Sequence, residues 1–280
     1  MNPDVTILYD SIRWEEKALL EAGKKKDINI QMVDCKKLAL DLEKNPEDYG
    51  VVIQRCVSYY RNVHSTAALE GLGVKVINCL NTGIFAGNKL FTHMLLKKFG
   101  VPTPDATVAF SKDAVLEALE AGGYPRVIKP TVGSWGRLIS KLNDKESAEG
   151  IIESRETMYP IYQIHYLEEF VNRPPRDIRA IMVGDKIVAA IYRKSDHWKT
   201  NMALGGTAEP CKITQEMEEM CIKAKNAVEG DIVGVDLMES EEKGLVVHEV
   251  NNTTEYKNTV RVCGVDIPSL MLDYAMKVER

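Results

Sequence analysis

Two carboxylates and an amide near the end of the chain have the residue types and spacing of a metal site. Asp236 lies in the apolar run "VGVDLM", and Glu249 lies thirteen residues later in "VVHEVN", followed by Asn251. Residues two apart on a strand point to the same face, so Glu249 and Asn251 share a face, and Asp236 joins them if the two runs pair across "ESEEKG". Mg²⁺ takes such oxygen ligands and leaves places for substrate phosphates. These residues predict a magnesium site, and the alternative is that both carboxylates are held in ion pairs with neighbouring Lys or Arg.

A second motif, "RVIKPTVGSWGR", has the composition of a phosphate-binding loop. Lys129 ends an apolar run, and a glycine-containing loop returns the chain to the next run. Glycines let backbone N–H groups approach phosphate oxygens, and Lys or Arg supplies the compensating charge. The loop matches neither the Walker A pattern nor G-x-G-x-x-G, and an ordinary hairpin with two turn glycines would look the same. The loop residues are Gly133, Ser134, Trp135, Gly136 and Arg137.

A third group of polar residues surrounds the start of the last third of the chain. Glu168 and Glu169 interrupt the apolar run "YLEEFV" before Phe170 and "RPPRD". Such a segment can present backbone amides and a carboxylate to an adenosine, or it is an edge strand that leads into a linker. Further along are hydrogen-bond donors suited to gripping carboxylate or phosphate, although a solvated loop is the simpler interpretation. These donors are Arg179, Arg193 and Asn201.

Other kinds of chemistry have little support in the sequence. No G-x-S-x-G elbow is present, and the five histidines lack metal-ligand spacing, so we interpret them as structural, with His197 the least certain because it lies among the donors. The six cysteines never fall at C-x-x-C spacing, which indicates reduced thiols. A net charge of -5 argues against nucleic acid as a partner. No apolar run approaches the roughly 18 residues of a membrane span, and no signal peptide is evident, so we expect a cytoplasmic protein with no membrane partner.

These residues must be positioned by three blocks of secondary structure. In the first block, short apolar runs such as "VTILYD" and "VVIQR" alternate with amphipathic segments, which predicts β-α-β units and a small parallel sheet. The second block has the strands and helices of a compact α+β lobe, including a helix over "LFTHMLLKKFG". The third block has further strands and two helices, and it is also α+β. We predict domains over residues 1–88, 89–170 and 171–280.

Taken in order, these motifs resemble the ATP-grasp superfamily over the whole chain. The resemblance is carried by Lys89, Lys129, the "GSWGR" loop, the strand with Glu168, and Asp236 with "E-x-N" at 249–251. It implies an ATP-grasp fold with an N-terminal Rossmann-like (pre-ATP-grasp) domain, a central α+β lobe and a C-terminal α+β lobe. More narrowly, "RDIRAIMVG", "AAIYR" and "HEVNNTTEYKN" resemble the LysX branch of RimK-type ligases. That branch joins the α-amino group of 2-aminoadipate to the γ-carboxyl of the C-terminal glutamate of the carrier protein LysW.

The resemblance implies a role for each matching residue. Lys89 and Lys129 would hold ATP phosphates, the 133–137 loop would close over them, and the segment from Glu168 would line the adenine and ribose pocket. Asn88 departs from relatives, which often carry Asp before the first lysine. Asp236, Glu249 and Asn251 would hold Mg²⁺. The amino acid would be oriented by Arg193, Asn201, Thr254, Glu255, Tyr256, Asn258 and Thr259.

The resemblance also bears on the amino acid and on the partners. In the family, Asn followed by Thr or Ala after the E-[FY]-K segment goes with aminoadipate, and Gly-Phe goes with glutamate; the pair here is Asn258-Thr259. A single methylene is worth only about 1–3 kcal/mol of discrimination, so some use of glutamate is expected. LysW is acidic, so we expect a local basic face to dock it, and a homo-oligomer (dimer or tetramer) is expected. The candidate docking residues are Arg137, Lys141, Lys194 and Lys199.

Two other functions stay open at this point. One is another ATP-grasp ligase, which uses glutamate on the same carrier or adds glutamate to a different protein. The other is a nucleotide-binding regulatory module without turnover, against which the intact Asp236, Glu249 and Asn251 argue. If the metal assignment is right, alanine at Asp236 or Glu249 abolishes ADP release without unfolding the protein.

Overall fold

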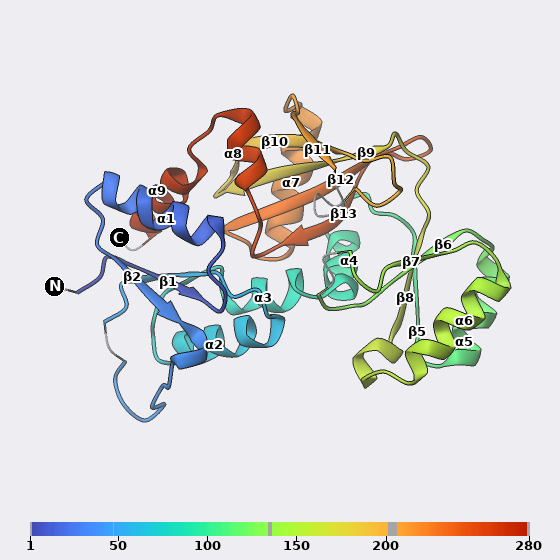
Figure 1. Ribbon diagram of the computed structural model, residues 1–280, viewed down its shortest axis with the longest axis horizontal. Helices are drawn as coiled ribbons and strands as arrows, with labels where there is room; N and C mark the ends of the chain where they lie inside the picture. The colour runs from blue at the N-terminus through green and yellow to red at the C-terminus, as the bar shows by residue number, and fades with distance from the viewer. Residues whose placement is uncertain (1, 47, 134–135, 201–205, 279–280) are drawn as a thin grey trace.

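The computed structural model describes residues 2–46, 48–133, 136–200 and 206–278, and it places three sheets side by side along the long axis of the molecule (Figure 1). The first sheet has the order β2-β1-β3-β4, and its neighbouring strands run parallel. This confirms the parallel sheet predicted from the alternation of apolar runs and amphipathic segments. Its elements are β1 (Val5–Tyr9), α1 (Trp14–Lys25), β2 (Ile30–Asp34), the 3-10 helix η1 (Cys35–Lys37), β3 (Val51–Gln54), α2 (Tyr59–Gly71), β4 (Val76–Ile77) and α3 (Leu80–Ala86).

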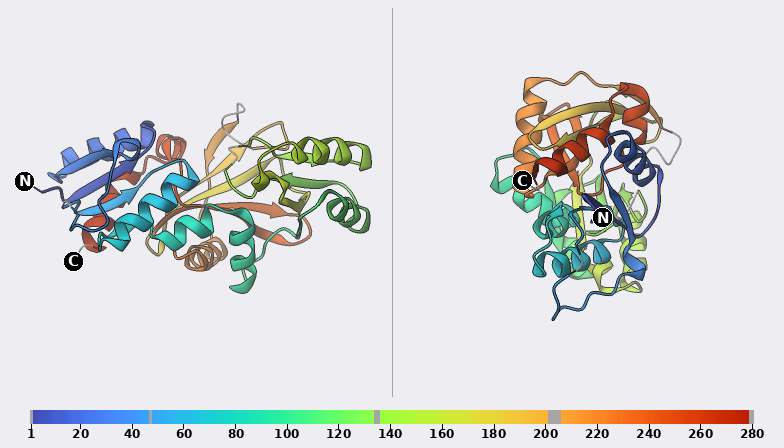
Figure 2. Two further views of the ribbon diagram at one scale, coloured as in Figure 1. Left: turned by 90° about the horizontal axis from the view of Figure 1, so that it is seen from below. Right: turned by 90° about the vertical axis from the view of Figure 1, so that its left-hand side faces the viewer.

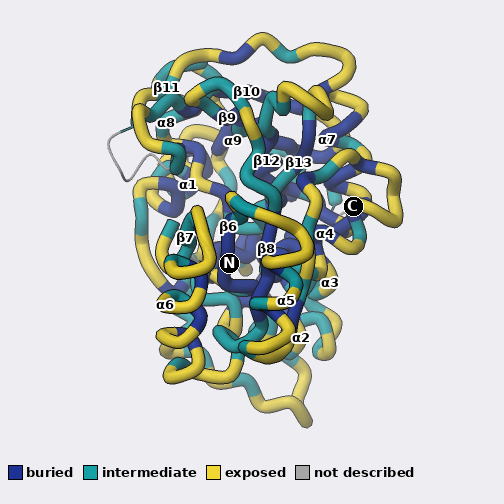
Figure 3. Tube along the Cα trace, turned by 90° about the vertical axis from the view of Figure 1, so that its right-hand side faces the viewer, coloured by how far each residue is buried: buried dark blue, intermediate teal, exposed yellow. Residues whose placement is uncertain are grey.

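The central lobe is an antiparallel sheet with two helices and a core of its own. Its strand order is β5-β8-β6-β7. Side chains of Ile128 and Leu167 pack against Leu119 and Ile152 from the two helices. The elements are β5 (Ala106–Ala109), α5 (Lys112–Gly122), β6 (Arg126–Lys129), β7 (Ser140–Leu142), α6 (Lys145–Glu156), η2 (Pro160–Gln163) and β8 (His165–Glu169). Figure 3 looks at this end of the molecule and shows exposed turns of α5 and α6 outside the buried strands.

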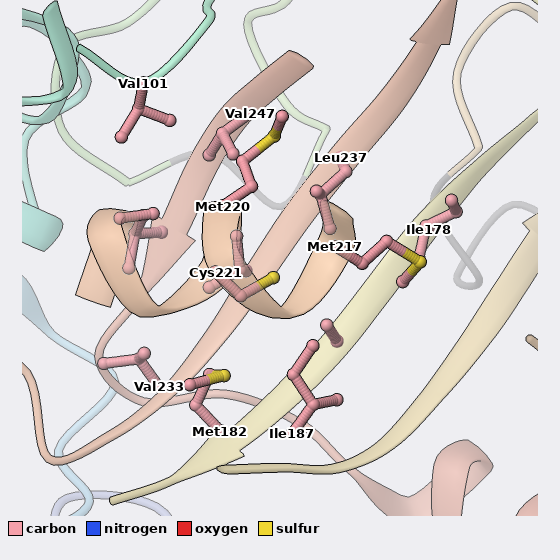
Figure 4. Close-up of a cluster of buried hydrophobic side chains, with 14 of the residues drawn as sticks. Val101, Ile178, Met182, Ile187, Met217, Met220, Cys221, Val233, Leu237 and Val247 are labelled. Atoms are coloured by element: carbon pink, nitrogen blue, oxygen red, sulfur yellow. The ribbon is translucent and has the colours of Figure 1, made fainter. Parts of the chain in front are cut away.

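The C-terminal lobe is a five-stranded antiparallel sheet with the order β11-β10-β9-β12-β13. Helix α7 lies on one face and packs its Met217, Met220 and Cys221 side chains against the strands (Figure 4). Thr214 is the N-cap of α7, and its side chain accepts a hydrogen bond from the N–H of Met217, which fixes where the helix begins. The elements are β9 (Arg176–Val183), β10 (Lys186–Lys194), β11 (Thr207–Pro210), α7 (Gln215–Ala227), β12 (Ile232–Ser240), β13 (Gly244–Asn251), α8 (Lys257–Cys263) and α9 (Ile267–Val278).

The N-terminal domain and the C-terminal lobe share one hydrophobic core. Helix α9 returns to the N-terminal sheet and packs beside α1, as Figures 1 and 2 show. Buried Ile7 and Ile53 from the first sheet lie in the same cluster as Ile181 from β9 and Leu272 from α9. The last helix of the chain therefore completes the first domain.

One helix packs differently from the expectation. The sequence analysis places residues 89–98 in the central lobe, whereas α4 (Lys89–Lys98) packs against α7 and β13 of the C-terminal lobe. Its buried Leu96 joins the core of that lobe, while His93 on the same helix packs edge-on against Tyr166 of the central lobe. The predicted domain boundaries at 88 and 170 otherwise stay a proposal. No helix among the described residues is both long and apolar enough to cross a bilayer.

Candidate active site

A cavity of about 950 Å³ opens where the three parts of the molecule meet. One end is lined by strands of the central lobe and the middle by the C-terminal sheet. The other end is lined by the N-terminal domain. Most of the residues singled out in the sequence border it: Lys89, Lys129, Gly133, Gly136, Glu168, Glu169, Phe170, Arg179, Arg193, Asp236, Glu249, Asn251, Thr254, Glu255, Asn258 and Thr259. Ser134, Trp135 and Asn201 lie outside the described residues.

The three candidate metal ligands lie together on the C-terminal sheet. Strands β12 and β13 pair antiparallel, and Asp236 is the register partner of Glu249. Asn251 Nδ2 lies 3.4 Å from Asp236 Oδ2. The register is interrupted by a bulge on β13 just before Glu249, and such bulges re-aim side chains beside active sites. The hairpin thus places two carboxylates and an amide at one point of the cavity.

Asp236 is bound by arginines in this structure. Arg179 donates to both carboxylate oxygens at 2.8 and 2.7 Å, and Arg193 Nη2 donates to Oδ2 at 3.0 Å. The Asp236 side chain is 2% exposed. Burial alone would raise the pKa of Asp236, but Arg179 and Arg193 hold it well below its usual range. Asp236 is therefore a permanent anion at neutral pH.

Glu249 is paired with the first lysine of α4. Lys89 Nζ lies 3.1 Å from Glu249 Oε1 and also donates to the carbonyl of Gly133 at 2.8 Å. Asn88 caps α4, since its side chain accepts from the N–H groups of Leu90 and Phe91. Asn at this position fulfils the same capping role that Asp would, so the departure from relatives leaves Lys89 in place. The ion-pair alternative therefore describes both Asp236 and Glu249 here, and the magnesium assignment stays a prediction.

The donor set nevertheless has the chemistry that Mg²⁺ takes. Among the described residues, no group of three or more His, Cys, Asp or Glu side chains could hold a metal alone. Mg²⁺ is usually bound through one or two carboxylates together with substrate phosphates and waters. Asp236, Glu249 and Asn251 supply two carboxylates and an amide oxygen, so they fit a Mg²⁺ ion that binds together with a nucleotide.

Lys129 and Glu168 form a buried pair at the central-lobe end. Lys129 Nζ donates to Glu168 Oε2, and Tyr166 Oη donates to Oε1 at 2.9 Å. Strands β6 and β8 are paired with Lys129 opposite Tyr166. Burial alone would raise the pKa of Glu168, but Lys129 lowers it. Glu168 therefore carries a negative charge at neutral pH although it is buried.

The segment predicted to line the adenine pocket borders the cavity, but some of its side chains are held by other residues of the protein. Glu169 is 2.7 Å from Lys243 Nζ, which directs its carboxylate to the C-terminal lobe. Phe170 lies edge-on to Trp198, with Lys141 Nζ 3.7 Å from the centre of its ring. The loop after β10 meets the glycine loop, because Lys199 Nζ donates to the carbonyls of Ile139 and Gly136. These contacts form a wall of the cavity from two lobes.

Arg193 borders the cavity, but its guanidinium is bound to carboxylates of the protein. Its guanidinium donates to both oxygens of Asp177 and to Asp236, and its side chain is 7% exposed. Thr200 also donates to Asp177. Arg193 therefore links two carboxylates beneath the cavity, and a bond from it to the amino acid would require one of these partners to move.

Two of the predicted residues do not face the cavity. Tyr256 is fully buried, and its hydroxyl donates to the carbonyl of Glu15. Its ring packs in the core shared by the N-terminal domain and the C-terminal lobe, so its predicted contact with the amino acid is wrong for the side chain. Arg137 is exposed and does not border the cavity.

The predicted basic docking face is also largely occupied. Lys194 pairs with Glu209 at 2.5 Å, Lys199 donates to two carbonyls, and Lys141 lies over Phe170. Lys194 is the one of the four with an ion pair among the described residues. A docking face made of these side chains therefore finds little support in their contacts.

Sequence reasoning missed several residues that line the cavity. His248, interpreted as structural, is the extra residue of the bulge on β13, and both ring nitrogens are buried with no hydrogen-bond partner among the described residues. Burial and the charge of Lys129 lower its pKa, so the ring is neutral near pH 7. Arg13, Tyr59 and Asn62 of the N-terminal domain also border the cavity. His248 directly precedes Glu249 in the sequence, and this position was the signal that could have identified it. Nothing in the sequence around Arg13, Tyr59 and Asn62 indicates that they border the cavity.

The chain matches two known domains end to end. Residues 5–84 match the LysX preATP-grasp domain, and residues 86–275 match the RimK-like ATP-grasp domain. It is 39% identical over 272 residues to the alpha-aminoadipate–LysW ligase LysX of Sulfurisphaera tokodaii, covering 95% of each chain. It is 33% identical to the glutamate–LysW ligase ArgX of Sulfolobus acidocaldarius, covering 96% of this chain and 97% of that one.

Solved structures share the fold. A RimK domain ATP-grasp protein from Sphaerobacter thermophilus superposes with a TM-score of 0.82 at 21% identity, covering 96% of this chain and 98% of that one. The D-alanine–D-alanine ligase of Bacillus anthracis, solved with ATP, superposes with a TM-score of 0.74 at 15% identity, covering 99% and 98%. At these identities the likeness establishes the fold.

Proposed function

Because the chain belongs to the RimK-like ATP-grasp family, we propose that it is an ATP-dependent ligase that joins 2-aminoadipate to the carrier protein LysW. The bond formed links the α-amino group of the amino acid to the γ-carboxyl of the carrier's C-terminal glutamate, as a step of lysine biosynthesis. The observation that carries this proposal is the 39% identity to an alpha-aminoadipate–LysW ligase over 95% of the chain.

The reaction proceeds in two balanced steps. The carrier carboxylate attacks the γ-phosphorus of ATP, which gives an acyl phosphate and ADP. The free amine of 2-aminoadipate then attacks the acyl carbon, loses a proton and expels inorganic phosphate. No protein nucleophile is required, which agrees with the lack of a Ser-His or Cys-His arrangement in the sequence.

The charges around the cavity explain how a triphosphate is accepted. Four cations, Lys89, Lys129, Arg179 and Arg193, are balanced by four carboxylates, Glu168, Asp177, Asp236 and Glu249. A balanced site gains little from an anionic ligand unless ion pairs open or the ligand brings its own cation. Mg²⁺, held by Asp236, Glu249 and Asn251, would supply that neutralisation when bound.

The protein's own residues then have distinct tasks. If Glu249 and Asp236 bound Mg²⁺, their partners Lys89 and Arg179 would become free to bind phosphate oxygens. Lys129 lies beside Glu168 at the nucleotide end. The wall formed by Lys199 and the glycine loop excludes water, which protects an acyl phosphate from hydrolysis.

Glutamate in place of 2-aminoadipate is the second candidate. The 33% identity to a glutamate–LysW ligase favours it less than the 39% favours 2-aminoadipate. Asn258 and Thr259 both border the cavity, and in the family this pair goes with 2-aminoadipate. Because one methylene is worth only about 1–3 kcal/mol, we expect a preference of about 10- to 100-fold and not an absolute one.

Mass spectrometry of the carrier tests the proposal. LysW is incubated with the protein, ATP, Mg²⁺ and either 2-aminoadipate or glutamate, and the intact carrier is weighed. We expect the increment of 2-aminoadipate less water, formed together with stoichiometric ADP. A carrier that lacks its terminal glutamate serves as the control. ADP release with no change in carrier mass, or a larger yield with glutamate, would overturn the proposal.

A further inference from the structure

The end of the cavity farthest from Lys129 is built by the N-terminal domain together with the segment 252–258. Glu15 Oε1 accepts the backbone N–H groups of Tyr256 and Lys257 at 3.2 and 3.1 Å. Arg55 Nη2 donates to the carbonyl of Thr254 at 3.1 Å. The shape of this segment is therefore set by side chains some two hundred positions away in the sequence.

Arg13 has a guanidinium nitrogen that is buried and unused. Its Nε and Nη2 donate to Glu16 at 3.2 and 2.7 Å. Its Nη1 is buried and has no hydrogen-bond partner among the described residues. It forms a long ion pair of 3.9 Å with Oε1 of Glu255, beyond hydrogen-bond distance, and the Glu255 side chain is 51% exposed. Buried polar nitrogens in folded proteins are nearly always hydrogen-bonded, so the free Nη1 marks a place for a ligand.

The buried carboxylate beside Arg13 is already shared by a second arginine. Glu16 is fully buried and is shared by two guanidinium groups, since Arg55 Nε also donates to Oε1 at 3.0 Å. Burial alone would raise the pKa of Glu16, but hydrogen bonds from Arg13 and the charge of Arg55 lower it. Glu16 is thus shared by two arginines, so its two oxygens leave Arg13 Nη1 without a hydrogen bond, although Glu15 and Glu255 also act on the charge of Arg13.

A second cation lies at the same end. Lys257 borders the cavity, and its ammonium group has no ion pair among the described residues. Its backbone is fixed by Glu15, two positions from Arg13 in the sequence. The two cations border the same end of one cavity and supply a fork and a point charge, which suit a carboxylate.

We propose that Arg13 Nη1, with Lys257 beside it, binds the terminal carboxylate of the amino-acid substrate. The inference rests on the proposed function and names the part of the substrate that the N-terminal domain recognises. The amine must lie near the phosphates to reach the acyl carbon, and the α-carboxylate is attached to the same carbon. The terminal carboxylate of a dicarboxylic amino acid is the group that reaches the opposite end.

The test compares 2-aminoadipate with 2-aminohexanoate, which has the same carbon chain without the terminal carboxylate. For Arg13→Gln we expect KM for 2-aminoadipate to rise about 10- to 100-fold, the loss typical of a charged hydrogen bond, while KM for ATP changes less than about twofold. In Arg13→Gln, KM for 2-aminohexanoate should not change. If turnover of 2-aminohexanoate is too slow to give a KM, its inhibition constant against 2-aminoadipate is measured instead and should likewise not change. Arg13→Lys, which keeps the charge and loses the fork, should give an intermediate KM.

A matched control separates recognition from folding. Lys26→Gln removes the ion pair between Lys26, the C-cap of α1, and Asp273 of α9 without touching the cavity, and its constants should equal those of the unaltered protein. An equal loss for both amino acids in Arg13→Gln, or an unchanged KM for 2-aminoadipate in Arg13→Gln and Arg13→Lys, would overturn the inference. Failure of the unaltered protein to couple 2-aminoadipate at all would instead refute the proposed function.

Discussion

Replacing Asp236 by alanine should abolish ADP release and also destabilise the fold. Its carboxylate is 2% exposed and receives three hydrogen bonds from Arg179 and Arg193, whose side chains are 14% and 7% exposed. Removing one partner of a buried ion pair typically costs about 3–5 kcal/mol, because the remaining charge stays buried without compensation. The expectation from the sequence that Asp236→Ala leaves folding intact is therefore revised by the structure.

Glu239→Ala is a matched control for this change. Arg176 binds Glu239 through the same two-bond geometry, at 2.6 and 2.8 Å, between the same two strands. The side chains of Arg176 and Glu239 are 31% and 32% exposed. Water can therefore solvate the charge of Arg176 when Glu239 is removed, and the expected loss of stability is about 0–1 kcal/mol. Glu249→Ala should lie between Asp236→Ala and its control in stability, since the Glu249 side chain is 28% exposed but its partner Lys89 is 8% exposed, and it should resemble Asp236→Ala in activity.

Urea denaturation followed by circular dichroism measures the stability of the three variants, and a coupled assay measures carrier-dependent ADP release. We expect Asp236→Ala to be less stable than Glu239→Ala by at least about 2 kcal/mol. Equal stability of these two variants would refute the view of Asp236 as the centre of a buried ion network. Turnover retained in Asp236→Ala or Glu249→Ala would refute their assignment as magnesium ligands.

Three further predictions follow from the same contacts. First, the low pKa of Asp236 contributes stability that is present above its unfolded pKa of about 3.9 and is lost as the pH falls below that value. The free energy of unfolding of Asp236→Ala should therefore depend less steeply on pH in acid than that of the unaltered protein. Equal slopes would contradict this. Second, a Cβ on Gly234 would lie 2.2 Å from Thr254 Oγ1, so Gly234→Ala should displace the segment after β13. We expect KM for the amino acid to rise about 10-fold or more, KM for ATP to stay unchanged, and stability to fall by about 1–3 kcal/mol. A KM for the amino acid within twofold of the unaltered protein would show that the segment adapts. Third, Lys129→Ala leaves Glu168 buried without its cation, so ATP affinity measured by calorimetry should fall at least about 10-fold. The control Lys145→Ala, at an exposed lysine, should bind ATP with the affinity of the unaltered protein. Equal ATP affinities of the two variants would show that Lys129 does not belong to the nucleotide site.

Much of the fold could be predicted because its signals are local. The run "VGVDLM", the polar turn and "VVHEVN" have the alternation and length of a hairpin, and the structure pairs Asp236 with Glu249 as expected. Parallel strands in the first block followed from apolar runs separated by amphipathic helices. The family resemblance supplied the order of motifs, and the family is confirmed.

The rest depended on contacts that no local pattern encodes. Nothing near Arg13 in the sequence indicates that it borders the same cavity as Lys257, since the two are joined by the docking of α1 on a distant segment. Tyr256 was assigned to the substrate because of its neighbours in the sequence, and its burial between two domains could not be read from that order. The arginines that bind Asp236 come from two other strands, whose register with β12 is a property of the whole sheet.

The shared core has a consequence for how the enzyme opens. Ile7, Ile181 and Leu272 lie in one cluster, so the N-terminal domain and the C-terminal lobe should unfold together and cannot rotate apart without exposing that cluster. The central lobe has a separate core around Ile128 and Leu119. We therefore expect nucleotide to enter by a movement of the central lobe against the joined N-terminal domain and C-terminal lobe, with the N-terminal end of the cavity left assembled.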